Sequence, residues 1–160
     1  MRKIFTFLLI VASNTCLCQW SANPAINNAI CTNYYNQSSI QMVSDGSGGA
    51  IITWTDSRFQ PNYTIFCQRI NATGIIQWTA DGVQVSGSSV TNSTQSITSD
   101  GNGGAIISWV IGGGFGSIYA QHINAGGAIQ LAANGLIICS ATATYQGHPS
   151  IASNGNGICI

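Results

Sequence analysis

The stretch SDGSGGAIITW, Ser44 to Trp54, decides the fold because the chain repeats it. It returns as SDGNGGAIISW, Ser99 to Trp109, and its opening returns again as SNGNGICI from Ser153. The copies begin 55 and 54 residues apart, since 99 − 44 = 55 and 153 − 99 = 54. A fixed period of this length indicates a repeat architecture in which each unit packs on its neighbours.

The repeat extends beyond this phrase. Ile65–Trp78 (IFCQRINATGIIQW) aligns with Ile118–Leu131 (IYAQHINAGGAIQL), and Thr79–Ser86 aligns with Ala132–Cys139. Gln19–Cys31 (QWSANPAINNAIC) is a longer version of the same closing segment. The mature chain is therefore expected to hold the end of one unit (19–31), two units (about 32–86 and 87–139) and a truncated third (140–160).

Each unit is expected to form four antiparallel strands joined by tight turns. Asp-Gly between apolar runs is a strong hairpin signal, because glycine accepts the positive φ that such turns require. No sustained helical period is present. The expected strands are 40–44, 50–55, 65–71 and 74–78 in the first unit, and 96–99, 105–110, 118–124 and 127–131 in the second. Residues 82–86 and 135–139 are expected to link each unit to the next.

The second and third strands carry apolar residues at both even and odd positions, so both faces of each sheet are expected to be buried. Four antiparallel strands per unit predict an all-β fold of β-propeller-like blades, with an open stack of small sheets as the alternative. The chain supplies about two and a half units. We therefore expect a fragment of a longer protein, an interrupted reading frame, or a protomer that completes its ring with partners.

The two units differ most in the segment after the second strand. It reads DSRFQPNY (Asp56 to Tyr63) in the first unit and IGGGFG in the second. A change of length and chemistry at one point of a repeat predicts an exposed loop, and loops on rigid frames commonly carry binding residues. We therefore expect ligand contacts from Asp56, Arg58, Phe59 and Tyr63.

The N-terminus has the layout of a secretory signal peptide. Arg2 and Lys3 precede the apolar run Ile4–Ala12, and the small residues Cys16 and Cys18 precede a cleavage point before Gln19. Residues 1–18 are therefore expected to be removed and the protein secreted or held at the cell surface. The apolar run has nine residues, whereas a membrane-spanning helix needs about 20, and no later segment qualifies.

Charged residues make up 5% of the chain, against about 25% in ordinary domains. After residue 18 the formal charge is 2 − 4 = −2, from two arginines and four aspartates. A chain without a basic stripe is not expected to bind nucleic acid or anionic membranes.

Four cysteines follow the predicted signal peptide: Cys31, Cys67, Cys139 and Cys159. They allow disulfides in an oxidising compartment. Cys67 stands where the next unit has Ala120, so a small apolar residue can replace the cysteine. Buried free thiols are therefore expected at least as much as disulfides. Their wide spacing lacks the pairs of a zinc site, so no metal and no cofactor is expected.

His122 and His148 are candidates for a general base, but neither has a nucleophile or partner in its sequence context, so structural roles are expected. Asp45, Asp100 and Asn154 recur in the Asp-Gly turn. Calcium ligation is one interpretation. Stabilisation of the turn by the side chain itself is favoured, because asparagine in the third copy serves a turn better than a cation.

The phrases NPAINNAICT, SDGSGGAIITWTDSR, IFCQRINATGIIQW and TADGVQV resemble repeats in large secreted proteins of Bacteroidetes and related bacteria. The resemblance covers residues 19–160. It implies a β-propeller-like repeat region, often followed by a sorting domain for type IX secretion, and it implies no particular catalytic role. SDGSGGAIITW is also loosely similar to the Asp-box turn of sialidase-like propellers, which is structural.

These observations predict a non-catalytic scaffold that binds a glycan or a surface protein, in adhesion for example. The alternative from another class is a fragment of an extracellular sialidase- or glycosidase-like propeller enzyme whose active site lies outside residues 1–160. A structural spacer without a ligand is the third hypothesis. The remaining blades of a longer chain are the partners that the repeat itself implies.

Overall fold

The computed structural model describes residues 23, 25, 27–87, 94–111, 116–140 and 146–153. The expected signal peptide, Asn154 and Cys159 lie outside these residues. The strands are β1 (Gln37–Ser44), β2 (Ala50–Phe59), β3 (Asn62–Ile70), β4 (Val83–Gln84), β5 (Ser96–Ser99), β6 (Ala105–Ile111), β7 (Ser117–Ile123) and β8 (Leu136–Cys139).

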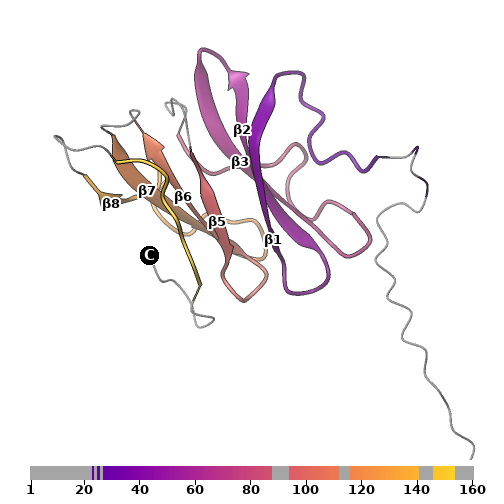
Figure 1. Cartoon of the computed structure of the whole chain (residues 1–160). Helices are drawn as coiled ribbons and strands as arrows, with labels where there is room; N and C mark the ends of the chain where they lie inside the picture. The colour runs from indigo at the N-terminus through magenta and orange to yellow at the C-terminus, as the bar shows by residue number, and fades with distance from the viewer. Residues whose placement is uncertain are drawn as a thin grey trace, which may run out of the picture.

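Within the described residues the strands form two four-stranded sheets, one for each predicted unit (Figure 1). Sheet 1 has the order β1-β2-β3-β4 and sheet 2 the order β5-β6-β7-β8, and every neighbouring pair is antiparallel. No helix occurs in this part of the chain. The predictions of an all-β chain and of repeated four-stranded antiparallel sheets are confirmed.

The turn between the first two strands forms as the sequence predicts. The Oδ1 of Asp45 accepts hydrogen bonds from the backbone N–H of Ser47 at 2.8 Å and of Gly49 at 2.7 Å. Gly46 has a φ of 77°, which glycine adopts without a Cβ penalty. Asp100 makes the same two bonds, both of 2.8 Å, in the second copy. The aspartate therefore stabilises its own turn, as expected.

The fourth strand lies in a different place from the one predicted. The expected strand 74–78 contributes an isolated bridge between Ile70 and Ile76, and 127–131 contributes the equivalent bridge between Ile123 and Ile129. β4 and β8 lie instead within 82–86 and 135–139, the segments expected to be links. The prediction of strands at 74–78 and 127–131 was wrong.

A buried glutamine in β3 explains this difference. The side chain of Gln68 is fully buried. Its Oε1 accepts a hydrogen bond from the backbone N–H of Trp78 at 3.1 Å, and its Nε2 donates to the carbonyl of Thr79 at 2.7 Å. The amide satisfies backbone groups that a strand partner would otherwise satisfy. Gln121 makes the same two bonds one unit later, at 2.9 and 2.7 Å.

The two sheets stack face to face. We call the face that carries Trp54 in sheet 1 and Trp109 in sheet 2 the leading face, and the opposite face, with Ile51 and Ile106, the trailing face. The core cluster joins the trailing face of sheet 1 to the leading face of sheet 2. Its buried members are Ile51, Ile65, Cys67, Trp78, Val85, Ile97, Ala105, Ile107, Trp109 and Ile123. Burial of each isoleucine stabilises the stack by about 1.5–3 kcal/mol.

The leading face of sheet 1 has a smaller cluster of its own. Trp54 and Phe66 stack there with ring centroids 6.2 Å apart, and Ile30 and Cys31 pack against this cluster. In the repeat alignment Ile30 stands where the first unit has Val85. Ile30 thus lies against sheet 1 as Val85 lies against sheet 2.

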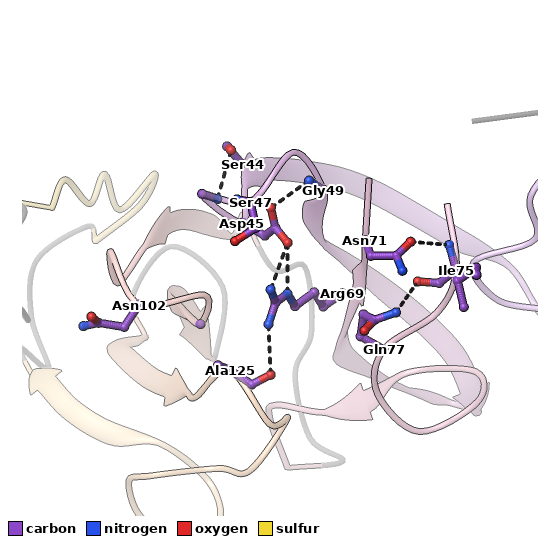
Figure 2. Close-up of polar contacts among 12 residues, drawn as sticks. Ser44, Asp45, Ser47, Gly49, Arg69, Asn71, Ile75, Gln77, Asn102 and Ala125 are labelled. Carbon is purple, nitrogen blue, oxygen red and sulfur yellow. Dashed lines mark hydrogen bonds and ion pairs between the residues drawn. The ribbon is translucent and has the colours of Figure 1, made fainter. Parts of the chain in front are cut away.

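Polar contacts also join the units. Trp78 donates from its indole Nε1 to the carbonyl of Ala125 at 3.0 Å, and Arg69 donates from Nη1 to the same carbonyl at 3.2 Å. Figure 2 shows the Arg69 guanidinium between Asp45 and Ala125. At the other side of the stack β1 lies beside β5 (Figure 1).

Candidate functional site

The four predicted ligand-binding residues do not lie on one exposed loop. β2 continues to Phe59 and β3 begins at Asn62, so a short turn replaces the expected loop. Phe59 and Tyr63 are exposed at 45% and 40%, as predicted. The prediction of exposure was wrong for Asp56, which is fully buried, and for Arg58, whose side chain is 13% exposed.

Asp56 and Arg58 satisfy each other inside the sheet. The Oδ2 of Asp56 accepts from the Arg58 Nη2 at 2.7 Å and from the indole Nε1 of Trp54 at 2.9 Å. Burial opposes ionisation of Asp56, but these bonds outweigh it and lower its pKa. The guanidinium lies 3.7 Å from the Phe66 ring centroid and donates to the Asp81 carbonyl at 2.9 Å. These contacts make the pair a structural element.

The histidine considered as a base also has a structural partner. The Nε2 of His122 lies 2.9 Å from the Oδ2 of Asp100, where the preceding unit has Arg69 Nη2 at 3.0 Å from Asp45 Oδ2. Burial of Asp45 opposes its ionisation, but hydrogen bonds from backbone N–H groups and from Arg69 outweigh burial and lower its pKa. Both contacts tie the turn after the first strand to the third strand.

A cavity of about 410 Å³ opens where the first strands of the units meet. It is lined by Ser39–Gln41, Thr94–Ser96 and His148–Pro149. These segments occupy one repeat position, because 39, 94 and 148 each lie five residues before the serine that opens the turn: 44 − 39 = 99 − 94 = 153 − 148 = 5. Three successive copies thus contribute the same position to one site.

Gln95 holds two of these segments together. It is 6% exposed, and its Nε2 donates to the carbonyl of Ser39 at 2.6 Å while its Oε1 accepts from the Thr55 hydroxyl at 3.3 Å. Ser39 has a φ of 53° and His148 a φ of 54°. Positive φ is uncommon outside glycine, and such backbone strain gathers at functional sites. Here a positive φ occurs at the same repeat position in two of the three copies.

The lining is polar and contains no Asp, Glu, Lys or Arg. Hydroxyls come from Ser39, Thr94 and Ser96, amides from Gln41 and Gln95, an imidazole from His148, and apolar surface from Ile40 and Pro149. The hydroxyl and amide groups both donate and accept hydrogen bonds and carry no charge. The site therefore fits an uncharged polar ligand.

This cavity was not predicted from the sequence, although the repeat alignment contains its signal. Residues 39, 94 and 148 share one column of that alignment, and the structure brings these three positions to one cavity. Ligand contacts were predicted instead in the variable segment that begins at Asp56, because its sequence differs most between the units. The glycine-rich stretch Ile111–Ser117 has residues 112–115 outside the described part of the chain.

Comparison with protein-family models, with curated proteins and with solved structures gives no match. Across the described ranges, no helix has the length and apolar character needed to span a membrane. No group of three His, Cys, Asp or Glu side chains able to hold a metal ion occurs among the same residues. Cys31, Cys67 and Cys139 are free thiols.

Proposed function

We propose that this chain is a secreted or cell-surface scaffold without catalytic activity, built from β-propeller-like blades, that binds an uncharged glycan in the cavity between its first strands. The observation that carries the proposal is the lining of that cavity by one repeat position of three successive copies. The ligand site in this proposal belongs to the repeat, and the exposed Phe59 and Tyr63 remain candidates for a second contact with a large glycan or a surface protein.

The arrangement of the sheets supports the blade-like architecture. The trailing face of sheet 1 packs on the leading face of sheet 2, so the same two faces can meet again with each added unit. β1 lies beside β5, and the segment with His148 and Pro149 joins them at one cavity. Blades of a propeller are placed in this way around a central channel.

The lining supports an uncharged sugar over a charged ligand. A sugar ring presents hydroxyls, which pair with hydroxyl and amide groups, and C–H faces, which pack on apolar side chains such as Ile40 and Pro149. No Asp, Glu, Lys or Arg belongs to the lining.

Secretion is proposed from the basic, apolar and small-residue pattern before Gln19. The family resemblance adds the type IX route to this proposal. Expression in a bacterium with that pathway, followed by mass determination of the extracellular protein, tests it. A mature N-terminus at Gln19 is expected, and retention of Met1 in the cytoplasm contradicts it.

The binding proposal is tested with an array of neutral glycans and with calorimetry on the sugars that bind. Thr94→Phe fills the cavity from an exposed position and should abolish binding. The matched control, Ser47→Phe, places the same ring in the turn after β1 and should leave binding unchanged. Equal binding by both variants, or no binding by the unmodified chain to any neutral glycan, excludes the proposed site.

A further inference from the structure

Comparing the exposure of equivalent residues in the two units shows which faces of the sheets are covered. Met42 of β1 is 60% exposed, whereas its equivalent Ile97 in β5 is 8% exposed and belongs to the core between the sheets. Ile40 is 61% exposed, whereas its equivalent Gln95 is 6% exposed. Sheet 1 covers the leading face of sheet 2. No described sheet covers the leading face of sheet 1 in the same way.

The leading face of sheet 1 is apolar, and its β1 side is exposed. A groove of about 290 Å³ lies there, lined by Ile30, Cys31, Gln37, Ile40, Met42, Ile52 and Trp54. The outer side of the groove is already closed by Ile30 and Cys31, which stand where the first unit has Val85 and Ser86. The inner side, at Ile40 and Met42, is open.

The opposite end of the stack shows the complementary pattern. Ile138 of β8 is 37% exposed, whereas its equivalent Val85 is 1% exposed in the core. Cys139 is exposed, whereas its equivalent Ser86 is 1% exposed. The trailing face of sheet 2 is therefore uncovered at its outer strand. Its inner part is covered, because Ile106 is fully buried.

Described segments before β1 and after β8 lie at the two ends of the stack. Residues 146–153 stand at the position of a first, inner strand, and His148 and Pro149 lie near Thr94–Ser96 of sheet 2. Residues 27–31 stand at the position of a last, outer strand against sheet 1.

We propose that copies of this chain associate head to tail, with the sheet 2 end of one copy docked on the leading face of sheet 1 of the next. Residues 146–153 of the first copy cover Ile40 and Met42 of the second, and residues 27–31 of the second cover Ile138 of the first. The contact repeats the trailing-on-leading packing already present between the two sheets. It is heterologous, so the two sides are different surfaces.

The chemistry of the two surfaces favours this association. β8 has the sequence LIIC, and Leu136, which pairs with Ala120 on the trailing face, is 49% exposed. Edge strands of soluble proteins are commonly protected by charged residues, and β8 has none. β1, QSSIQMVS, is also uncharged, so neither side opposes docking by charge repulsion. Exposed apolar surface of this kind marks protein contacts.

The experiment measures the mass of the purified full chain by sedimentation velocity over a range of concentrations. Met42→Asp alters the leading face and Ile138→Asp alters the trailing face, both at exposed positions that a folded monomer tolerates. Each variant alone should be monomeric, with self-association weakened by more than about tenfold, because each buries a carboxylate in the contact. An equimolar mixture should form one-to-one dimers, since each variant retains the surface that the other has lost.

The control is Ile75→Asp, which alters a side chain exposed to 61% whose equivalent, Ala128, is also exposed. This variant should associate as the unmodified chain does, and circular dichroism should show all three variants folded. A monomeric unmodified chain at every concentration overturns the proposal. Persistent self-association of either single variant, or a mixture that stays monomeric, also overturns it. Glycan binding is measured separately and does not affect this result.

Discussion

The imidazole Nε2 of His122 lies 2.9 Å from the Oδ2 of Asp100. One unit earlier the guanidinium of Arg69 occupies the same place beside Asp45. The repeat therefore keeps an acidic turn residue and a cationic or imidazole partner on the third strand, and it changes the chemistry of that partner. The contact fastens each turn to its own sheet.

Asp100→Asn should lower the free energy of unfolding by about 1 kcal/mol at neutral pH. An asparagine Oδ1 can still accept from the two backbone N–H groups of the turn, while the charge facing His122 is lost. Burial opposes ionisation of Asp100, but the contact with His122 and the backbone hydrogen bonds outweigh it, so its pKa is lowered.

A lowered pKa in the folded state gives a stabilisation that is present above the ordinary carboxyl pKa of about 4 and is lost as pH falls through the folded pKa. Urea unfolding measures the free energy of unfolding of the unmodified chain and of Asp100→Asn at neutral pH and at the lowest pH at which both fold. The difference between the two proteins should be smaller in acid. A difference that is constant with pH contradicts the assignment.

Gly49→Ala should prevent stable folding or cost about 3 kcal/mol or more. A Cβ at this position would overlap the carbonyl oxygen of Ile70, and it would also lie 2.8 Å from the Cα of Asn71. Gly46→Ala is the matched control. A Cβ there meets no atom within 4 Å, and the positive φ alone should cost about 1 kcal/mol. Thermal unfolding of both variants tests whether Gly49→Ala lowers the stability more than Gly46→Ala. Equal losses of stability contradict the prediction.

Gln68→Leu should destabilise the chain by about 2–4 kcal/mol, because the Trp78 N–H and the Thr79 carbonyl each lose a hydrogen-bond partner. Gln68→Glu keeps an acceptor for Trp78 but places a carboxylate beside the Thr79 carbonyl, so it should be more stable in mild acid than at neutral pH. Hydrogen exchange at the Trp78 amide should rise in the leucine variant, which lacks the acceptor, and rise less in the glutamate variant, which keeps it. Unchanged exchange there would show that the loop is held by other contacts.

The parts of the fold that the sequence predicts are those with local signals. The Asp-Gly turns and the apolar runs of β2 and β6 depend on residues close in the chain, and the structure forms them in place. The fourth strand depends on Gln68, whose amide binds backbone groups ten and eleven residues away. The pattern of apolar residues does not show which of the two segments, 74–78 or 82–86, forms the fourth strand.

The candidate site shows the same division. Asp56 and Arg58 have the polar composition of a loop, yet Trp54 and Phe66 give them partners inside the sheet. The cavity near Ser39 combines three segments far apart in sequence, so its position follows from the stacking of units and from no single motif.

The cysteines should differ in reactivity in the native chain. Burial raises the pKa of the Cys67 thiol and removes it from solvent, while Cys139 is exposed. Burial also raises the pKa of the half-buried Cys31, against the opposing effects of a backbone hydrogen bond and of Arg58. Because the thiolate is the nucleophile, Cys139 should be alkylated first, Cys31 more slowly and Cys67 after unfolding. Iodoacetamide labelling followed by peptide mass mapping measures each site.

The equivalent of Cys67 in the second unit is Ala120, which is also fully buried. Cys67→Ala should therefore fold with a loss of about 1 kcal/mol from the smaller side chain, and it should leave the labelling of Cys139 and Cys31 unchanged. Cys67→Ser buries a hydroxyl at the same place and should cost more. Rapid labelling of Cys67 in the native chain, or a serine variant as stable as the alanine variant, would contradict its place in the core between the two sheets.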